Sequence, residues 1–135
     1  MPSIITITFN PAIDKSTSVA ALMPEKKLRC TIPVYEPGGG GINVARAIKK
    51  LGGEATALFL AGGYTGKAFA DLLSAESVTS IMIETTGATR ENLVVAETGT
   101  NQQYRFGMPG PNITEYEWKA CLAAIEEKDD VQYIV

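Results

Sequence analysis

Short, nearly continuous apolar runs alternate along the chain with segments whose apolar residues recur at helical spacing. The runs at 4–9, 55–61 and 78–84 are rich in β-branched and aliphatic residues, which is typical of buried strands. Helical patterns carry apolar residues on one face at Val44, Ile48 and Leu51, at Phe69, Leu72 and Leu73, and at Trp118, Cys121, Leu122 and Ile125. Strands that alternate with helices predict an α/β fold with a mainly parallel sheet flanked by helices.

Two extended segments do not fit this alternation. Leu28–Tyr35 has the composition of a strand, and Pro33 favours an edge position because proline has no amide hydrogen to donate. Residues 91–106 have the pattern of a β-hairpin around a glycine-containing turn. We expect the segments at about 16–35 and 91–106 to pair into a small side sheet.

Local signals mark the helix boundaries and the end of the chain. Gly52-Gly53 ends the first helix, Thr65 can cap the second, and Thr114 with Glu117 has the spacing of a capping box for the third. Residues 131–135 have the pattern of a strand that is only beginning. The length of 135 residues suits one domain or part of one, and we expect the N-terminal part of a longer protein.

Composition excludes several classes of function. The net charge is −3, with acidic and basic residues mixed, which argues against nucleic-acid binding by bulk charge. There is no histidine, which excludes Ser-His-Asp and Cys-His nucleophiles and HExxH zinc sites. Cys30 and Cys121 form no CxxC pair and are expected to be reduced thiols. No signal peptide or membrane-spanning run is evident, so we expect a cytoplasmic protein that does not bind a membrane.

Four consecutive glycines, Gly38–Gly41, stand immediately before the first helix. Such a run permits close approach of a ligand to backbone amides at a helix N-terminus, although a flexible loop has the same composition. Asn43 in the first turn can donate to and accept from a hydroxyl or phosphate. Neither GxGxxG nor an intact Walker A motif is present, because residues 61–68 have alanine at both ends of the latter.

Three charged residues complete the candidate chemistry. Asp14 follows the end of the first strand, where open α/β sheets bind their ligands. Lys27 and Arg90 are candidate cations for a phosphate, with arginine better suited to two-pronged contact. Each alone reads as a surface charge, whereas together with the glycines they suit a sugar phosphate.

The sequence from Gly38 to Ala45, with Gly52 and Gly62 at fixed spacing, resembles the N-terminal signature of the ribokinase-like (phosphofructokinase B) carbohydrate kinases. The opening Thr6–Asp14 is similar to the phosphosugar kinases of that family. The resemblance implies a ribokinase-like fold with a small β-sheet lid, here the segments at about 16–35 and 91–106. It covers essentially the whole chain but only the N-terminal part of such a kinase.

The resemblance also implies an activity, namely ATP- and Mg²⁺-dependent phosphorylation of fructose 6-phosphate to fructose 1,6-bisphosphate. Gly40 stands where fructose-1-phosphate kinases and ribokinases usually carry lysine, which favours fructose 6-phosphate over fructose 1-phosphate. Tagatose 6-phosphate is the closest alternative. A non-catalytic fragment and a sugar-phosphate-binding module remain further alternatives.

By resemblance, Asp14 holds sugar hydroxyls, Gly39 and Asn43 line the sugar site with Gly40 and Gly41, and Lys27 and Arg90 address the phosphate. The lid is implied to form a homodimer interface. The family's catalytic aspartate lies in a Gly-Ala-Gly-Asp motif that residues 1–135 do not contain. No catalytic residue is therefore expected in this chain, ATP and Mg²⁺ are expected to bind mainly beyond it, and the isolated chain is expected to be inactive.

Overall fold

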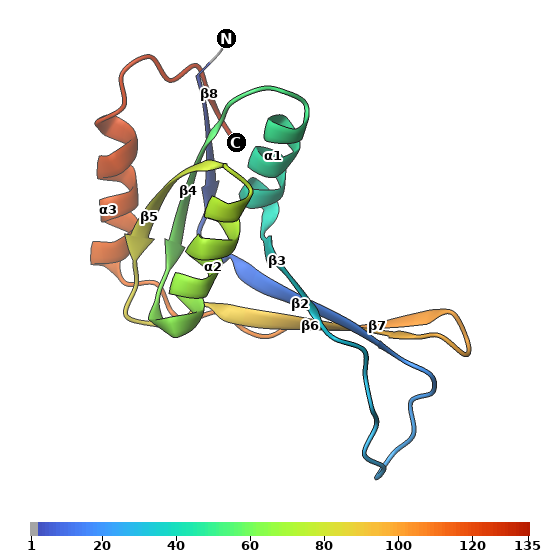
Figure 1. The fold of residues 1–135 in the computed structure, drawn as a ribbon. Coiled ribbons are helices and arrows are strands. Elements are labelled where there is room, and N and C mark those ends of the chain that lie inside the picture. Colours follow the sequence, from blue (N-terminus) through green and yellow to red (C-terminus); the bar gives the residue numbers. More distant parts are fainter. Residues whose placement is uncertain (1–2) are drawn as a thin grey trace.

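The computed structural model describes residues 3–135, which form two β-sheets and three helices (Figure 1). The first sheet is parallel, with the order β5-β4-β1-β8, and contains β1 (Ile4–Thr8), β4 (Thr56–Ala61), β5 (Thr79–Glu84) and β8 (Tyr133–Ile134). The second sheet is mixed, with the order β3-β2-β6-β7, and contains β2 (Ala12–Val19), β3 (Val34–Gly38), β6 (Arg90–Glu97) and β7 (Gln102–Phe106). The helices are α1 (Gly40–Lys50), α2 (Gly63–Ala75) and α3 (Glu115–Glu126).

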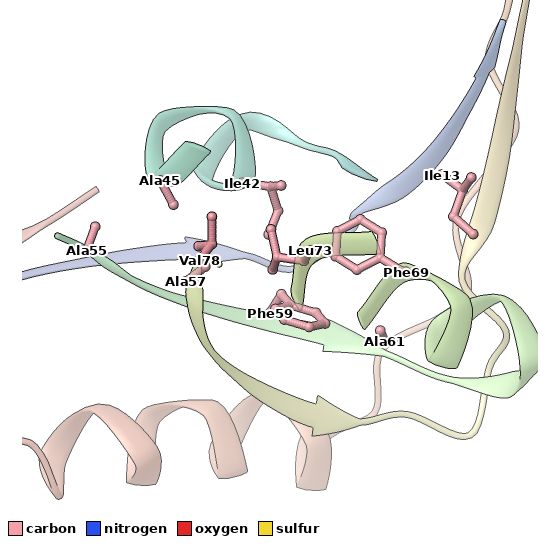
Figure 2. Close-up of a cluster of buried hydrophobic side chains, with 10 residues drawn as sticks. All are labelled: Ile13, Ile42, Ala45, Ala55, Ala57, Phe59, Ala61, Phe69, Leu73 and Val78. Atoms are coloured by element: carbon pink, nitrogen blue, oxygen red, sulfur yellow. The ribbon is translucent and has the colours of Figure 1, made fainter. Parts of the chain in front are cut away.

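The parallel sheet is covered on both faces, as the alternating pattern predicts. Helices α1 and α2 lie over one face, where Phe59 and Phe69 pack with ring centroids 5.1 Å apart (Figure 2). On the other face, Leu58 and Leu60 pack with Cys121 of α3. Successive side chains of β4 therefore point to opposite helical layers, and both layers exclude water.

Two predicted helix faces are partly wrong. Leu51 is 87% exposed, because α1 ends at Lys50, and the helix buries Ile42 and Ala45 instead. In α3 the predicted Cys121 is buried, but Leu122 is 46% exposed and the buried neighbour of Cys121 is the charged Glu117. Leu51 was assigned to the core although the helix ends before it, and Leu122 was assigned to it by apolar character although it lies beside the buried row of α3. Trp118 of the same predicted face is also exposed, at 36%. The predicted residues that do lie in or against the core are Ile48, Phe69, Leu72, Leu73, Cys121 and Ile125.

The predicted side sheet is confirmed, with shifted boundaries. Strand β2 already begins at Ala12, and residues 28–33 are not a strand, so the third strand begins only at Val34. This strand lies at the edge of the sheet, as the proline predicts. The 20–33 connection folds back on β2, where the Thr31 amide donates to the Ser18 carbonyl at 3.0 Å. The hairpin of β6 and β7 is where the sequence places it.

Helix capping follows the sequence at α3 and departs from it at α2. The capping box forms, since Thr114 Oγ1 accepts from the Glu117 amide at 3.2 Å and Glu117 accepts in return from the Thr114 amide at 3.1 Å. In contrast, α2 begins after Gly62, and the Thr65 hydroxyl donates to the Thr89 carbonyl. Thr65 therefore ties α2 to the residue immediately before β6 rather than capping the helix.

Both described cysteines are free thiols, as expected, with Cys121 buried and Cys30 exposed. Across residues 3–135, none of the helices combines the length and apolar character that crossing a membrane requires.

Candidate functional site

The glycine run lies at the carboxyl end of β1, where it leads from the second sheet into α1. Thr8 Oγ1 accepts a hydrogen bond from the Ile42 amide at 3.1 Å, which fixes the first turn of α1 against the end of β1. A Cβ on Gly41 would lie 2.6 Å from Thr8 Oγ1 and 2.7 Å from the Ile7 carbonyl oxygen. Gly41 is therefore required because helix and strand approach too closely for any side chain.

The other three glycines differ in their surroundings. Gly39 has φ +128, a conformation that residues with a side chain rarely adopt. A Cβ on Gly38 would collide with the carboxylate of Asp14. Gly40 meets nothing within 4 Å, so the space beside it is open. Its amide and that of Gly41 are among the first four of α1 and have no acceptor within the helix.

Asp14 and Arg90 lie in neighbouring rows on one face of the second sheet. Gly38, Ala12 and Arg90 pair across three strands, and Glu36, Asp14 and Asn92 form the next row on the same face, two residues along each strand. A groove of about 450 Å³ runs over this face and is lined by polar side chains that include Asp14, Ser16, Glu36, Asn92, Gln103 and Arg105. The groove combines carboxylates, amides and a cation, which suits a polyhydroxylated anion.

Arg90 is held in place by backbone carbonyls. Its Nη1 donates to the Met108 carbonyl at 3.2 Å and its Nη2 donates to the Asn10 carbonyl at 3.1 Å. Asn10 belongs to the turn between the two sheets, and the Met108 amide is in turn bound by Asn92 Oδ1 at 2.9 Å. Arg90 Nε is buried and has no partner among the described residues. The guanidinium thus sits at the junction of the two sheets.

Two predicted site residues lie apart from this cluster or at its border. Asn43 is exposed in the first turn of α1, and its backbone amide donates to the Gly39 carbonyl at 2.8 Å. Lys27 is exposed in the 20–33 connection, which extends away from the glycine run (Figure 1). Within the described part of this chain, the structure brings the glycines, Asp14 and Arg90 together and does not bring Lys27 to them.

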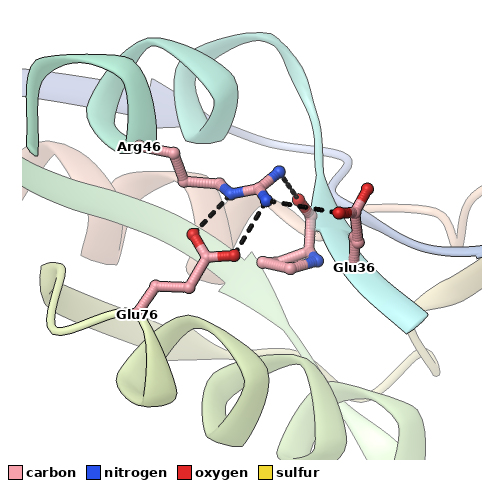
Figure 3. A network of polar contacts seen from close by, with 4 residues as sticks. Glu36, Arg46 and Glu76 are labelled. Atoms are coloured by element: carbon pink, nitrogen blue, oxygen red, sulfur yellow. Dashed lines mark hydrogen bonds and ion pairs between the residues drawn. The ribbon is translucent and has the colours of Figure 1, made fainter. Parts of the chain in front are cut away.

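The sequence analysis missed Arg46. This arginine lies on α1 with its side chain only 14% exposed, and its Nη1 donates to the Pro37 carbonyl at 2.9 Å, immediately before the glycine run (Figure 3). A charged residue on a helix is usually solvated, so residue type alone does not mark Arg46 as buried. The available signal was its position four residues after Ile42, on the row that faces the core.

Between residues 3 and 135, no group of three or more histidine, cysteine, aspartate or glutamate side chains could hold a metal ion.

Comparison with known proteins shows which family has this sequence and this architecture. The sequence profile described as pfkB family carbohydrate kinase matches residues 4–134. The chain is 50% identical, over 90% of its length, to ATP-dependent 6-phosphofructokinase isozyme 2 from Mycobacterium tuberculosis H37Rv, of which it covers 36%. It is 31% identical, over 92% of its length, to D-tagatose-1-phosphate kinase from Bacillus licheniformis, of which it covers 40%.

A solved structure agrees with these sequence matches. The crystal structure of phosphofructokinase-2 from Escherichia coli in complex with fructose-6-phosphate superposes with a TM-score of 0.90 and 46% identity, covering 99% of this chain and 45% of that one. The chain thus spans less than half the length of these relatives. The match confirms the ribokinase-like α/β fold, with its parallel sheet and second mixed sheet. The chain belongs to the pfkB family of carbohydrate kinases.

Proposed function

We propose that the complete protein transfers the γ-phosphoryl group of ATP to the 1-hydroxyl of fructose 6-phosphate, and that this chain supplies the sugar-phosphate site. The observation that carries the proposal is the arrangement at the start of α1. The Asp14 carboxylate and the fixed Arg90 lie in adjacent rows of one sheet face, and Gly38, in the row of Arg90, leads into the open N-terminus of α1. Relatives named ATP-dependent 6-phosphofructokinase at 50% identity support the same reading.

Each group has a distinct task in this proposal. The carboxylate of Asp14 accepts hydrogen bonds from sugar hydroxyls. The amides of Gly40 and Gly41 face the ligand, and the positive end of α1 favours an anion there. Arg90 holds the phosphate, while Gly39 and Asn43 border the sugar. Phosphoryl transfer depends mainly on positioning and charge neutralisation, and this chain supplies those for the acceptor.

We further propose that the second sheet is a lid over the acceptor, with segments at about 16–35 and 91–106. The sheet projects from the body at the end where the glycine run lies (Figure 1). Closure would exclude water from the transferred phosphoryl group and thus suppress hydrolysis of ATP. Lys27 lies on the 20–33 connection of this sheet, so its proposed contact with the phosphate depends on that closure or on assembly.

The opposite face of the second sheet supports a homodimer. Tyr35, Lys15, Leu93 and Phe106 form one row across its four strands. Tyr35 is 43% exposed and Phe106 is 46% exposed, and a large exposed apolar side chain on a sheet face suits an interface. We propose that two lids pack through this face.

ATP and Mg²⁺ are proposed to bind mainly through parts of the complete protein outside residues 1–135. The purified 135-residue chain is accordingly expected to show no ATP-dependent turnover of fructose 6-phosphate. Turnover by that chain alone would overturn this part of the proposal.

The test of the proposed function is an acceptor panel on the complete protein. Fructose 6-phosphate is expected to give the highest kcat/KM among fructose 6-phosphate, tagatose 6-phosphate and fructose 1-phosphate, with the product identified as the 1,6-bisphosphate. Arg90→Ala is expected to raise the KM for the sugar phosphate about 10- to 150-fold, which corresponds to one lost charge-assisted hydrogen bond. An unchanged KM with Arg90→Ala would exclude Arg90 from the phosphate site, and preference for another acceptor would replace the proposed substrate.

A further inference from the structure

Arg46 connects both helices on one face of the parallel sheet to the start of the glycine run. Its Nε and Nη2 donate to the two carboxylate oxygens of Glu76, at 2.6 and 2.8 Å, in a two-pronged contact (Figure 3). Glu76 is the C-terminal cap of α2. The remaining Nη1 donates to the carbonyl oxygen of Pro37 at 2.9 Å. One guanidinium thus links α1, the end of α2 and the end of β3, immediately before the glycines.

The contact with Pro37 leads directly to the proposed sugar site. Pro37 is followed by Gly38, whose Cα lies against the carboxylate of Asp14. A shift of the Pro37 carbonyl would therefore move the peptide that packs on Asp14 and the amides that follow it. Lysine could not replace Arg46 here, because an ammonium group lacks the planar fork that reaches two carboxylate oxygens and a carbonyl together.

Charge provides a second argument. Asp14 and Glu36 lie directly opposite each other on adjacent strands, an arrangement that is destabilising for like charges. Arg46 Nη2 lies 3.9 Å from Glu36 Oε1. Hydrogen bonding to Glu76 and the nearby charges of Glu76, Glu36 and Asp14 raise the pKa of Arg46, so it is a permanent cation in this acidic group. Its charge offsets two carboxylates that would otherwise repel an anionic substrate.

We propose that Arg46 is a positioning residue for the acceptor sugar phosphate, holding the glycine run and Asp14 in the geometry that binds it. The residue does not touch the substrate and acts through the Pro37 carbonyl and through the charge balance around Asp14. This inference rests on the proposed function, and it adds to it a residue from outside the glycine signature and the charged candidates.

The experiment compares four single variants of the complete protein. Arg46→Met removes all three contacts, Arg46→Lys keeps the charge without the fork, and Glu76→Gln weakens the link to α2 while leaving the Pro37 contact. Lys49→Met is the matched control, because Lys49 pairs with Glu54 at 2.6 Å on the outer side of the same helix. The readouts are the KM values for sugar phosphate and ATP, kcat, the thermal midpoint, and hydrogen exchange of the peptide covering residues 36–43.

Arg46→Met and Arg46→Lys are expected to raise the KM for the sugar phosphate at least tenfold, with less than a twofold change in the KM for ATP, and to accelerate hydrogen exchange in residues 36–43. Glu76→Gln is expected to lower the thermal midpoint while changing the sugar-phosphate KM less than threefold, and Lys49→Met is expected to resemble the unchanged protein. Equal effects of Arg46→Met and Glu76→Gln on every readout would overturn the proposal, since Arg46 would then be only a strut between helices.

Failure of the proposed function gives a different pattern. If the unchanged protein phosphorylates no sugar phosphate, the proposed function fails. Hydrogen exchange then tests by itself whether Arg46 holds the glycine run in place. Exchange in residues 36–43 that is unaffected by Arg46→Met would then refute the structural link itself.

Discussion

Two adjacent glycines allow the packing and the binding roles of the run to be separated by the same substitution. Gly41 lies against β1, whereas Gly40 faces open space. A methyl group added to Gly41 would lie 2.6 Å from Thr8 Oγ1, while ordinary contacts begin at 3.4 Å. Thr8 cannot easily rotate away, because its hydroxyl holds the Ile42 amide. We therefore expect Gly41→Ala to lower the free energy of unfolding by about 1–3 kcal/mol, the usual cost of overpacking.

Gly40→Ala has the opposite expected profile. Apart from its chain neighbours and the backbone of its own helix, no atom of residues 3–135 lies within 4 Å of the added methyl. Alanine is also favoured over glycine in a helix by about 0.5–1 kcal/mol. The free energy of unfolding should therefore be unchanged or slightly higher. Under the proposed function the sugar phosphate occupies this space, so its KM should rise about 5- to 150-fold from the steric conflict.

The assay is urea unfolding of the complete protein and of both variants, followed by KM measurement for sugar phosphate and ATP. If Gly40→Ala destabilises the protein as much as Gly41→Ala, the difference in packing between the two glycines is wrong. If Gly40→Ala is stable and its sugar-phosphate KM is unchanged, the run does not contact the acceptor.

Three further outcomes are expected. Asp14→Asn should raise the sugar-phosphate KM about tenfold or more through the loss of charge-assisted hydrogen bonds, with the KM for ATP unchanged; equal changes in both KM values would contradict its role. Phe59→Ala should lower the free energy of unfolding by about 3–5 kcal/mol, because Phe59 is fully buried against Phe69; urea unfolding measures this, and a loss below 1 kcal/mol would contradict the assigned core. Hydrogen bonds from the Thr114 and Thr86 amides lower the pKa of Glu117, so its contribution to stability is present above about pH 4.5 and is lost as the pH falls through the lowered pKa. Between pH 7 and pH 3 the thermal midpoint of Glu117→Gln should therefore fall less steeply than that of the unchanged protein. The same slope in both proteins would refute this.

The layered fold could be predicted because its signals are local and mutually consistent. The continuous apolar runs of the strands, the glycines that end α1 and the Thr114 capping box each act within a few residues. The errors occurred where tertiary contacts override spacing. Thr65 has the chemistry of a cap, but the Thr89 carbonyl is close enough in space to take its hydroxyl. Leu51 continues the apolar row, but the helix ends before it can reach the core.

The glycine run and Asp14 could be predicted as site residues because they lie at the start of the first helix and just after the first strand. Asp14 and the glycines are brought together because β2 pairs with β3 in a register that the sequence does not reveal. Its place on the core-facing row of α1 indicates that Arg46 is partly buried, but the role proposed for it does not follow from the sequence, because Glu76 and Pro37 lie on opposite sides of it in the sequence and meet only in the folded chain. Lys27 has the right chemistry, but its place in space depends on the path of the 20–33 connection.

The most direct measurement is a crystal structure of the complete protein with fructose 6-phosphate bound. The account predicts a sugar hydroxyl within about 3.2 Å of the Asp14 carboxylate, the phosphate within about 3.2 Å of the Arg90 guanidinium, and the ligand beside the amides of Gly40 and Gly41. A sugar phosphate bound elsewhere, with Asp14 and these amides facing solvent, would contradict it.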